Sequence, residues 1–389
     1  MELDKNQKLG IFLKSTRKYG EGEVLLKEKP FIHWSIQDEV ESRFEFLEET
    51  TLSIFIGFIQ QLNDSNIKFL LSNYCYVDHD SHTDLVNKKL GSYVEIAKKL
   101  AEMFEIEWKV IFNVLTVPML NGHTVDDSCG LFNTGSKFTH DCDPNCVVTS
   151  IGNEIRFTAI RDIDEGEILT CSYLSGDQLL MPTILRQYSL LMKKSFICRC
   201  KKCSNLDEQR TIPCECGGFL HKASGAEPFL DLLDVLVLYD FQFQLNPDWI
   251  CTSCHVITNA LDSDLYILQK LYTEELDEED IYELKTWVDT KPSPTSWLLF
   301  KFLQIGFELY MEEVDEIDEQ IEEYSRLLLR WLLDSSPVAV LTNLGMGYAE
   351  MLLERNPELA KEYISKCLPS ATYMWGEDDE DVQWMVTNQ

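Results

Sequence analysis

Long uncharged apolar runs are absent from this chain of 389 residues. A membrane-spanning helix needs about 20 predominantly apolar residues, and the longest candidates, residues 52–59 and 229–243, are too short or are interrupted by Asp. The amino-terminal stretch MELDKNQKLGIF also lacks the apolar segment of a secretory signal. We therefore expect no membrane association, and a location in the cytoplasm, the nucleus or both.

Basic side chains are scarce as well. The chain has 34 Lys and Arg against 66 Asp and Glu, a formal charge of −32, and residues 256–389 alone have 9 against 29, a charge of −20. Because nucleic-acid binding depends on Lys and Arg at the phosphates, we expect no direct binding to nucleic acid. Such a surface attracts basic protein partners, and the alternative is a solvated acidic face that keeps the protein soluble.

Gly-punctuated apolar segments mark two parts of the chain that we expect to form β-strands. The first is residues 9–34, with a turn at 18–23, and the second is residues 130–173. Between them, residues 37–117 carry apolar side chains at three- and four-residue steps, which predicts several amphipathic helices. The hydrophobic fraction of 45% is typical of a globular protein with room for two or three domains.

The sequence predicts mostly helices for the rest of the chain. Residues 182–194 predict a short helix in front of a cysteine group. The candidate helices of the last third are 262–272, 279–288, 296–310, 317–333, 338–355 and 357–367. Paired helices of this length suggest a tetratricopeptide-like bundle, although the sequence has no clean 34-residue signature. An unrelated α-helical domain is the alternative.

Most of the 13 cysteines lie in two groups. In a chain without a secretion signal, such groups bind metal more often than they form disulfides. The first group, Cys198, Cys200 and Cys203, has C-x-C-x2-C spacing and needs a fourth ligand to close a tetrahedral zinc site. We expect that ligand to be Cys142, which lies in the turn at residues 141–145.

The second group supplies four thiolates by itself. Cys214 and Cys216 are followed by two glycines that suit a knuckle, and Cys251 and Cys254 follow after a long insert that we expect to be helical. This pattern predicts a second zinc site. Buried free thiols are the alternative for both groups.

Four segments carry motifs that occur together in one enzyme family. They are Gly10 with the strand at residues 19–26, Thr139-His140-Asp141-Cys142-Asp143-Pro144-Asn145, Gly166-Glu-Ile-Leu-Thr-Cys-Ser-Tyr173, and Phe196-Ile-Cys198-Arg-Cys200-Lys-Lys-Cys203. In this order they resemble the SET-domain protein lysine methyltransferases, in particular the branch that combines SET with a MYND zinc finger and a helical C-terminal domain. The MYND finger has no counterpart, since Cys75 is the only cysteine between residues 34 and 117.

The resemblance implies a pseudoknot-like β fold with S-adenosylmethionine on one face and a target lysine on the other. Tyr173 would be the catalytic residue, with its hydroxyl at the point of methyl transfer. The residues that would hold the cofactor are Gly10, Asn113, Thr139, His140, Tyr173 and Phe196. Without the motifs, Tyr173 would be read as a β-core aromatic, Phe196 as packing and Asn113 as a polar residue near a helix end.

Three positions depart from the family. Thr139 stands where the family has Asn, Lys8 where it has the first Gly of a G-x-G motif, and Lys194 where relatives often carry Tyr. Two hypotheses follow. The first is an active S-adenosylmethionine-dependent protein-lysine N-methyltransferase, a monomer acting on a basic substrate such as a histone or a ribosomal protein. The second is a weak or inactive SET protein that serves as an interaction module.

The predicted fold class is α+β: a SET β fold with a helical insertion, a zinc-binding post-SET region and an acidic α-helical C-terminal domain. The expected division is 1–36 N-terminal part of SET, 37–117 helical insertion, 118–195 core SET, 196–256 cysteine-rich region and 257–389 helical domain.

Overall fold

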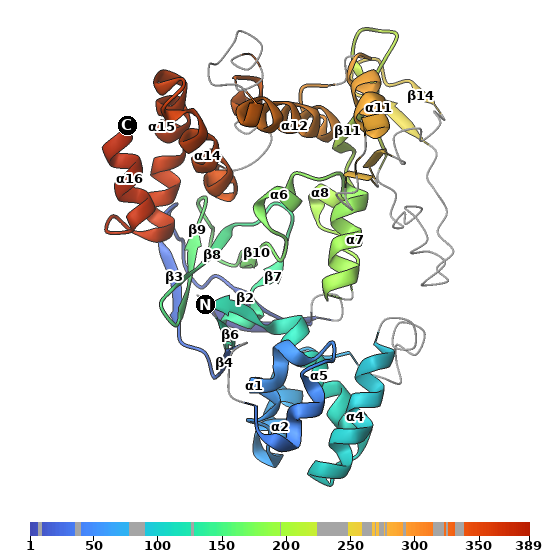
Figure 1. Cartoon of the computed structure of the whole chain (residues 1–389), viewed down its shortest axis with the longest axis vertical. Helices are drawn as coiled ribbons and strands as arrows, with labels where there is room; N and C mark the ends of the chain where they lie inside the picture. Colours follow the sequence, from blue (N-terminus) through green and yellow to red (C-terminus); the bar gives the residue numbers. More distant parts are fainter. Residues whose placement is uncertain are drawn as a thin grey trace. The chain divides into compact units, whose positions relative to one another are not determined.

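The chain forms two compact units in the computed structural model (Figure 1). The first unit comprises Met1–Thr139, Val148–Cys171 and Leu191–Phe196, and the second comprises the remaining segments up to Gln389. The structure describes residues 1–6, 10–35, 40–77, 90–125, 128–194, 196–223, 248–258, 267–268, 270–271, 276, 278–290, 293–313, 323, 326–330 and 338–389.

Short antiparallel strands form the β part of the first unit. They are β1 (Glu2–Asn6), β2 (Gly10–Lys14), β3 (Val24–Glu28), β4 (Ile32–Ser35), β5 (His123–Val125), β6 (Ser128–Leu131), β8 (Cys146–Ile151), β9 (Glu154–Ala159) and the two-residue strands β7 (Thr139–His140) and β10 (Thr170–Cys171). Strand β1 pairs with β2, and two three-stranded sheets have the orders β3-β9-β8 and β4-β6-β5. The strands predicted on either side of residues 37–117 are therefore confirmed.

Helices fill the segment between β4 and β5, as the three- and four-residue spacing predicted. They are the 3-10 helices η1 (Ser42–Leu47) and η2 (Ser53–Phe55), the α-helices α1 (Ile56–Ile59), α2 (Asp64–Asn73), α4 (Gly91–Phe104) and α5 (Trp108–Asn121), and, after β6, η3 (Gly135–Lys137). Their apolar faces meet in one core that includes Phe44, Phe58, Phe112 and Trp34. Burial of these large side chains supplies the main stabilisation of this part.

The second unit combines a small sheet with helices. Its strands β11 (Asp207–Pro213), β12 (Phe219–Lys222), β13 (Trp249–Cys251) and β14 (Ile257–Thr258) form one sheet in chain order. Its helices are α6 (Gly176–Leu179), α7 (Thr183–Lys194) as far as Leu190, α8 (Lys201–Ser204), α11 (Glu278–Val288), α12 (Trp297–Glu313), α14 (Val338–Leu353), α15 (Pro357–Trp375) and α16 (Glu380–Asn388). The predicted α+β class and the helical C-terminal region are confirmed.

Helix α7 belongs to the core of the helical region. Ile184 and Leu185 of α7 are buried in one cluster with Trp297 and Phe307 of α12 and Tyr363 of α15. The segment that leads into α12 is also tied to the sheet, because the Ser293 N–H donates to Thr211 Oγ1 of β11. The sheet, α7 and the helical region are thus parts of one packed unit.

Helix α15 extends beyond the end predicted at Cys367. Pro369 lacks an N–H and so cannot make one of the helical hydrogen bonds, yet α15 continues to Trp375 and stops before Gly376, whose φ is +108°. Ala371 and Met374 are buried, and this burial compensates for the lost hydrogen bond. Helix α16 is absent from the candidate helices predicted from the sequence. It begins after Asp379, whose carboxylate accepts hydrogen bonds from the N–H groups of Asp381 and Val382.

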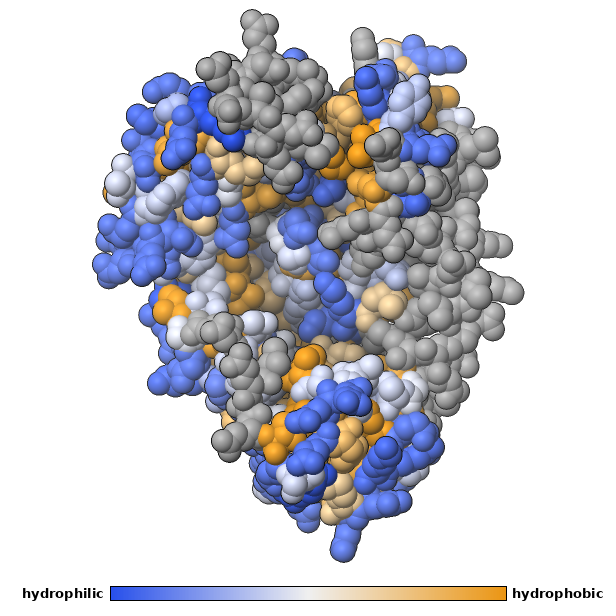
Figure 2. Space-filling view, in the orientation of Figure 1, coloured by the Kyte–Doolittle hydropathy of each residue, from blue (hydrophilic) through white to orange (hydrophobic). Residues whose placement is uncertain are grey.

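The acidic C-terminal helices present a polar face. In Figure 2, the surface over α15 and α16 is mostly hydrophilic. Among the described residues, no helix is both long enough and apolar enough to pass through a bilayer. The helices expected at 262–272 and 317–333 and the helical insert before Cys251 lie largely outside the described residues.

Candidate active site and metal centres

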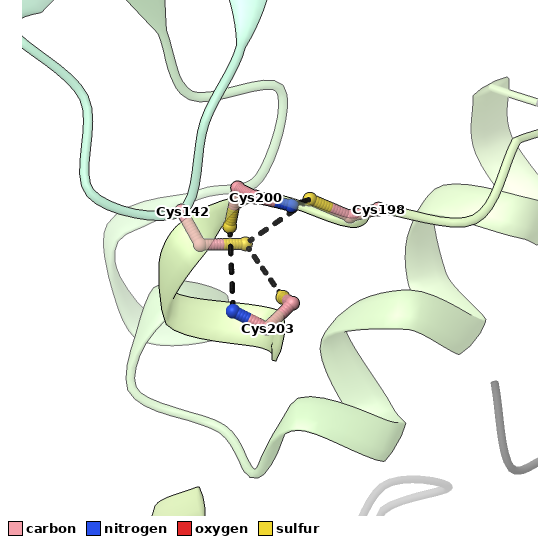
Figure 3. Close-up of side chains that lie close together, drawn as sticks. All are labelled: Cys142, Cys198, Cys200 and Cys203. Atoms are coloured by element: carbon pink, nitrogen blue, oxygen red, sulfur yellow. Dashed lines mark hydrogen bonds between the residues drawn. The ribbon is translucent and has the colours of Figure 1, made fainter. Parts of the chain in front are cut away.

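Four cysteine sulfurs converge in the second unit, as predicted. Sγ of Cys142 lies 3.5 Å from Sγ of Cys203 and 4.0 Å from Sγ of Cys198, and the four sulfurs, with that of Cys200, lie within 4.8 Å of one another (Figure 3). A tetrahedral metal with metal–sulfur bonds of about 2.3 Å requires sulfur separations of roughly 3.8 Å. The arrangement therefore fits a tetrathiolate metal site.

Two short elements bring these sulfurs together. Asp141 and Asp143 hold the turn that carries Cys142, since the Asp143 N–H donates to Asp141 Oδ1 at 2.8 Å. On the other side, the Cys203 N–H donates to Sγ of Cys200 at 3.4 Å as the chain enters α8. Backbone N–H bonds to sulfur favour the thiolate form that binds a metal.

Arg186 is the charged neighbour of this site. Its side chain is fully buried at 0% exposure, and its guanidinium donates to Sγ of Cys203 at 3.7 Å and to Thr183 Oγ1 at 2.9 Å. Burial acts to lower the pKa of Arg186, but Cys203 and Cys142 outweigh it, so the pKa lies above its ordinary value. A divalent metal with four thiolates would carry a net charge of two negative units, and Arg186 would offset part of it.

The role of Arg186 was not predicted, although the sequence contains a signal for it. Arg186 lies one helical turn before Leu190 in the predicted helix, so the two side chains share a face that combines a charge with an apolar residue. Such a charge needs a buried partner of opposite sign. The cysteine group that follows in the sequence supplies that partner.

Replacement of Arg186 by Met is expected to lower the free energy of unfolding of the metal-loaded protein by about 3 kcal/mol, because it leaves buried thiolate charge uncompensated. Arg199→Met is the matched control, since Arg199 lies between two of the cysteines but is exposed, and its effect should stay within about 0.5 kcal/mol. Urea unfolding of both variants measures the difference. Equal stabilities would contradict the role assigned to Arg186.

The second cysteine group also comes together. Cys214 and Cys254 have their sulfurs 3.8 Å apart, and those of Cys216 and Cys251 are 3.6 Å apart. All four lie within 4.8 Å of one another, at the ends of β11 and β13. This geometry fits a second metal site.

Glycine conformation shapes one half of the second site. Gly217 has a φ of +84°, and a Cβ on Gly218 would lie 2.5 Å from Oγ of Ser253 in the opposite half. A side chain at either position would therefore be strained or would collide. The two glycines predicted to suit a knuckle have this structural reason.

His140 links the first metal site to Tyr173. Its Nε2 lies 3.3 Å from Sγ of Cys142, and its Nδ1 accepts a hydrogen bond from the Tyr173 N–H at 3.0 Å. The His140 and Tyr173 rings are 5.4 Å apart. Burial lowers the pKa of His140 to about 4, so the imidazole is neutral at neutral pH.

The other residues expected at the cofactor lie in the first unit. Gly10 has a φ of +69°, which favours glycine, and begins β2. Thr139 donates its N–H to the Leu169 carbonyl at 3.3 Å. Phe196 is partly buried. Lys8 lies outside the described residues.

Asn113 lies within α5 and not in a strand. With its amide nitrogen facing the nearest acceptors, it donates to the carbonyls of Val77 at 3.1 Å and Lys109 at 3.2 Å. The bond to Val77 ties α5 to the segment after α2, whereas the bond to Lys109 lies within α5. The contact of Asn113 with a cofactor stays a prediction.

Lys194 occupies a partly buried position in the first unit. Its Nζ donates to the carbonyls of Met119 at 3.1 Å and Leu120 at 3.2 Å, which lie at the C-terminal end of α5. The negative end of the helix dipole favours a cation there. Burial lowers the pKa of Lys194 to about 8, and burial together with the charge of Lys194 lowers the pKa of His123 to about 4.

His123 is therefore expected to make the first unit sensitive to acid. Above about pH 6.5, the His123 side chain is mostly neutral in both the folded and the unfolded chain. Between pH 6.5 and 4 the unfolded chain takes up the proton first, so the free energy of unfolding should fall by at most about 3 kcal/mol. His123→Phe keeps the edge contacts with Phe132 and Phe157 and should remove this loss.

Urea unfolding of wild type and His123→Phe at pH 7 and pH 4.5 measures the effect. The exposed His33 of β4, replaced by Phe, is the control. An equal loss of stability on acidification in wild type and His123→Phe would refute this expectation.

Comparison with known proteins finds one family model that matches part of the chain. Residues 10–174 match the SET domain. The chain is 35% identical over 107 residues to the histone-lysine N-methyltransferase SMYD3 of Homo sapiens, which covers 28% of this chain and 24% of that protein. It is 32% identical over 128 residues to the SET domain and MYND-type zinc finger protein 6 of Schizosaccharomyces pombe, covering 32% and 25%.

A third relative is the N-lysine methyltransferase SMYD2-B of Danio rerio, 33% identical over 90 residues, which are 22% of this chain and 20% of that protein. The matched segments thus span a quarter or less of these relatives. The matching family segment begins at Gly10 and ends just after Tyr173, and so contains the His140–Cys142 turn. Residues 10–174 are therefore similar to a SET domain, and the relatives that match the chain include proteins of the SET-and-MYND branch.

Proposed function

We propose that this chain is a protein-lysine N-methyltransferase that uses S-adenosylmethionine. The observation that carries the proposal is the position of Tyr173, whose backbone is held by His140 beside the tetrathiolate site, within a segment that matches the SET domain. Relatives that match this segment bear names of lysine methyltransferases. These names support the proposed activity.

The chemical problem for such an enzyme is the lysine amine. Its pKa in water is about 10.4, so less than about 0.1% of it is nucleophilic at pH 7. S-adenosylmethionine would supply an electrophilic methyl group. In our proposal, the hydroxyl of Tyr173 orients the neutral amine toward that methyl group, which lowers the barrier by alignment.

The remaining groups of the site hold and separate the reactants. We propose that Gly10, Asn113, Thr139, His140 and Phe196 contact the cofactor, with Phe196 over its adenine. Both nitrogens of the His140 side chain are already engaged, so we expect its contact to come from the backbone. We further propose zinc in both cysteine groups, because four thiolates in tetrahedral range are typical zinc ligands.

The substrate is expected to be a basic protein, such as a histone or a ribosomal protein. The charge of −20 over residues 256–389 supports this choice, since an acidic region steers basic partners toward the protein. The same charge speaks against direct nucleic-acid binding. We expect a monomer in the cytoplasm, the nucleus or both.

Methyl transfer from labelled S-adenosylmethionine to histone and ribosomal protein mixtures tests the activity. Incorporation into protein lysine is expected. The enzyme proposal is refuted if the zinc-loaded wild type, like the Tyr173→Phe variant, transfers no label to protein in any mixture.

The alternative is a SET protein retained as an interaction module, which the threonine at position 139 favours. The lost amide contact could cost about 1.5–3 kcal/mol, roughly ten- to a hundredfold in cofactor affinity. Calorimetry with S-adenosylmethionine separates the two. Micromolar binding contradicts the alternative, and loss of binding that Thr139→Asn restores would support it.

A further inference from the structure

His140 is placed between two groups that carry separate parts of the proposed function. On one side, its Nε2 is 3.3 Å from Sγ of Cys142, a member of the first metal site. On the other side, its Nδ1 is 3.0 Å from the main-chain N of Tyr173. His140 is 8% exposed and Cys142 is 3% exposed, so water competes little for either contact.

The chemistry of the two partners fixes the tautomer of the imidazole. A backbone N–H can only donate, so Nδ1 must present its lone pair to Tyr173. The proton of the neutral ring is then on Nε2, which points at Sγ of Cys142. A metal-bound thiolate accepts such a bond well, whereas a thiol sulfur is a weak acceptor.

We infer that His140 is a positioning residue that couples the state of the Cys142 metal site to the backbone of Tyr173. This inference rests on the proposed function in one respect, which is that Tyr173 is the catalytic residue of the proposed methyltransferase. Through this coupling, the metal site would influence the position of the Tyr173 backbone in addition to stabilising the fold. Exchange of one metal ion for another would alter the bond from Nε2 and thereby the orientation of the ring that holds Tyr173.

Substitutions at His140 can cut each contact separately. In His140→Asn, the amide oxygen takes the place of Nδ1, so the bond from Tyr173 stays and the bond to Cys142 is lost. In His140→Gln, the amide nitrogen takes the place of Nε2, so the contact with Cys142 stays and the acceptor for Tyr173 is lost. A role in packing alone would not distinguish these two variants.

The test exchanges Zn²⁺ for Cd²⁺ in the folded full-length protein, labelled with ¹⁵N-tyrosine, without cofactor or substrate. The amide resonance of Tyr173, assigned with Tyr173→Phe, is expected to shift on the exchange in wild type. The amide of Tyr363 in α15 is the internal control and should not shift. In His140→Asn and His140→Gln, the response of Tyr173 to the metal should be lost.

Amide hydrogen exchange in the zinc-loaded variants adds a second readout. Tyr173 should exchange about tenfold faster in His140→Gln than in wild type, because one hydrogen bond is lost, and should be little changed in His140→Asn. Two results overturn the inference. One is a Tyr173 amide resonance that does not shift on metal exchange in wild type, and the other is a shift in His140→Asn that equals the wild-type shift. If neither variant folds, the wild-type comparison of Tyr173 with Tyr363 still decides. Since neither readout uses S-adenosylmethionine, failure of the methyltransferase proposal is detected separately.

Discussion

Replacing Tyr173 by Phe is expected to lower the rate of methyl transfer by about 10²- to 10³-fold, the effect of removing one hydroxyl that orients or stabilises the reacting groups. The fold should be unaffected, because the contact that holds this residue runs from its main-chain N–H to His140. Binding of S-adenosylmethionine should change little. A single-turnover assay with labelled cofactor, together with calorimetry, separates the two quantities.

Tyr282→Phe is the control for this experiment. Tyr282 lies in α11 and is 73% exposed, so its hydroxyl has no part in the proposed site and its variant should transfer methyl groups at the wild-type rate. Two results would count against the role of Tyr173. One is wild-type activity in Tyr173→Phe, and the other is a loss that is explained entirely by weaker cofactor binding.

Loss of one thiolate from the first metal site is expected to have the largest effect on stability. Cys142→Ser replaces a ligand by a hydroxyl that binds zinc poorly, so the protein should lose one equivalent of metal. Because metal binding and folding are coupled in such sites, the free energy of unfolding of the second unit should fall by roughly 5 kcal/mol or more. Metal analysis and urea unfolding measure both losses.

Cys146→Ser is the matched control for Cys142→Ser. Cys146 is also buried, at 1% exposure, but its sulfur contacts Asn145 Oδ1 at 3.4 Å and lies outside both cysteine groups. A serine hydroxyl can keep that hydrogen bond. If Cys142→Ser retains its metal and unfolds at the same urea concentration as Cys146→Ser, the assignment of the ligands is wrong.

Much of the metal chemistry could be predicted from spacing alone. Three cysteines at C-x-C-x2-C spacing required a fourth ligand, and the turn at residues 141–145 offered Cys142, whose Sγ lies 3.5 Å from Sγ of Cys203. Spacing is informative here because tetrahedral coordination fixes the number and the separation of the ligands. The second cysteine group was predictable for the same reason.

Contacts that depend on side-chain direction could not be predicted. The sequence does not indicate that both nitrogens of His140 are engaged, or that the guanidinium of Arg186 reaches Cys203, since these follow from tertiary packing. The prediction that this helix ends at Cys367 was wrong for a related reason, since α15 continues to Trp375. Pro369 is a local signal to stop, and the burial of Ala371 and Met374 outweighs it.

Helix α7 has consequences for any attempt to divide the chain. Its Arg186 faces the first metal site, while Ile184 and Leu185 are buried among the C-terminal helices. A truncation after residue 256 would remove those helices and leave both side chains exposed to water, which favours aggregation. We therefore expect limited proteolysis of the acidic region to end in release of metal, so that the second unit is degraded as a whole and leaves no stable metal-binding fragment.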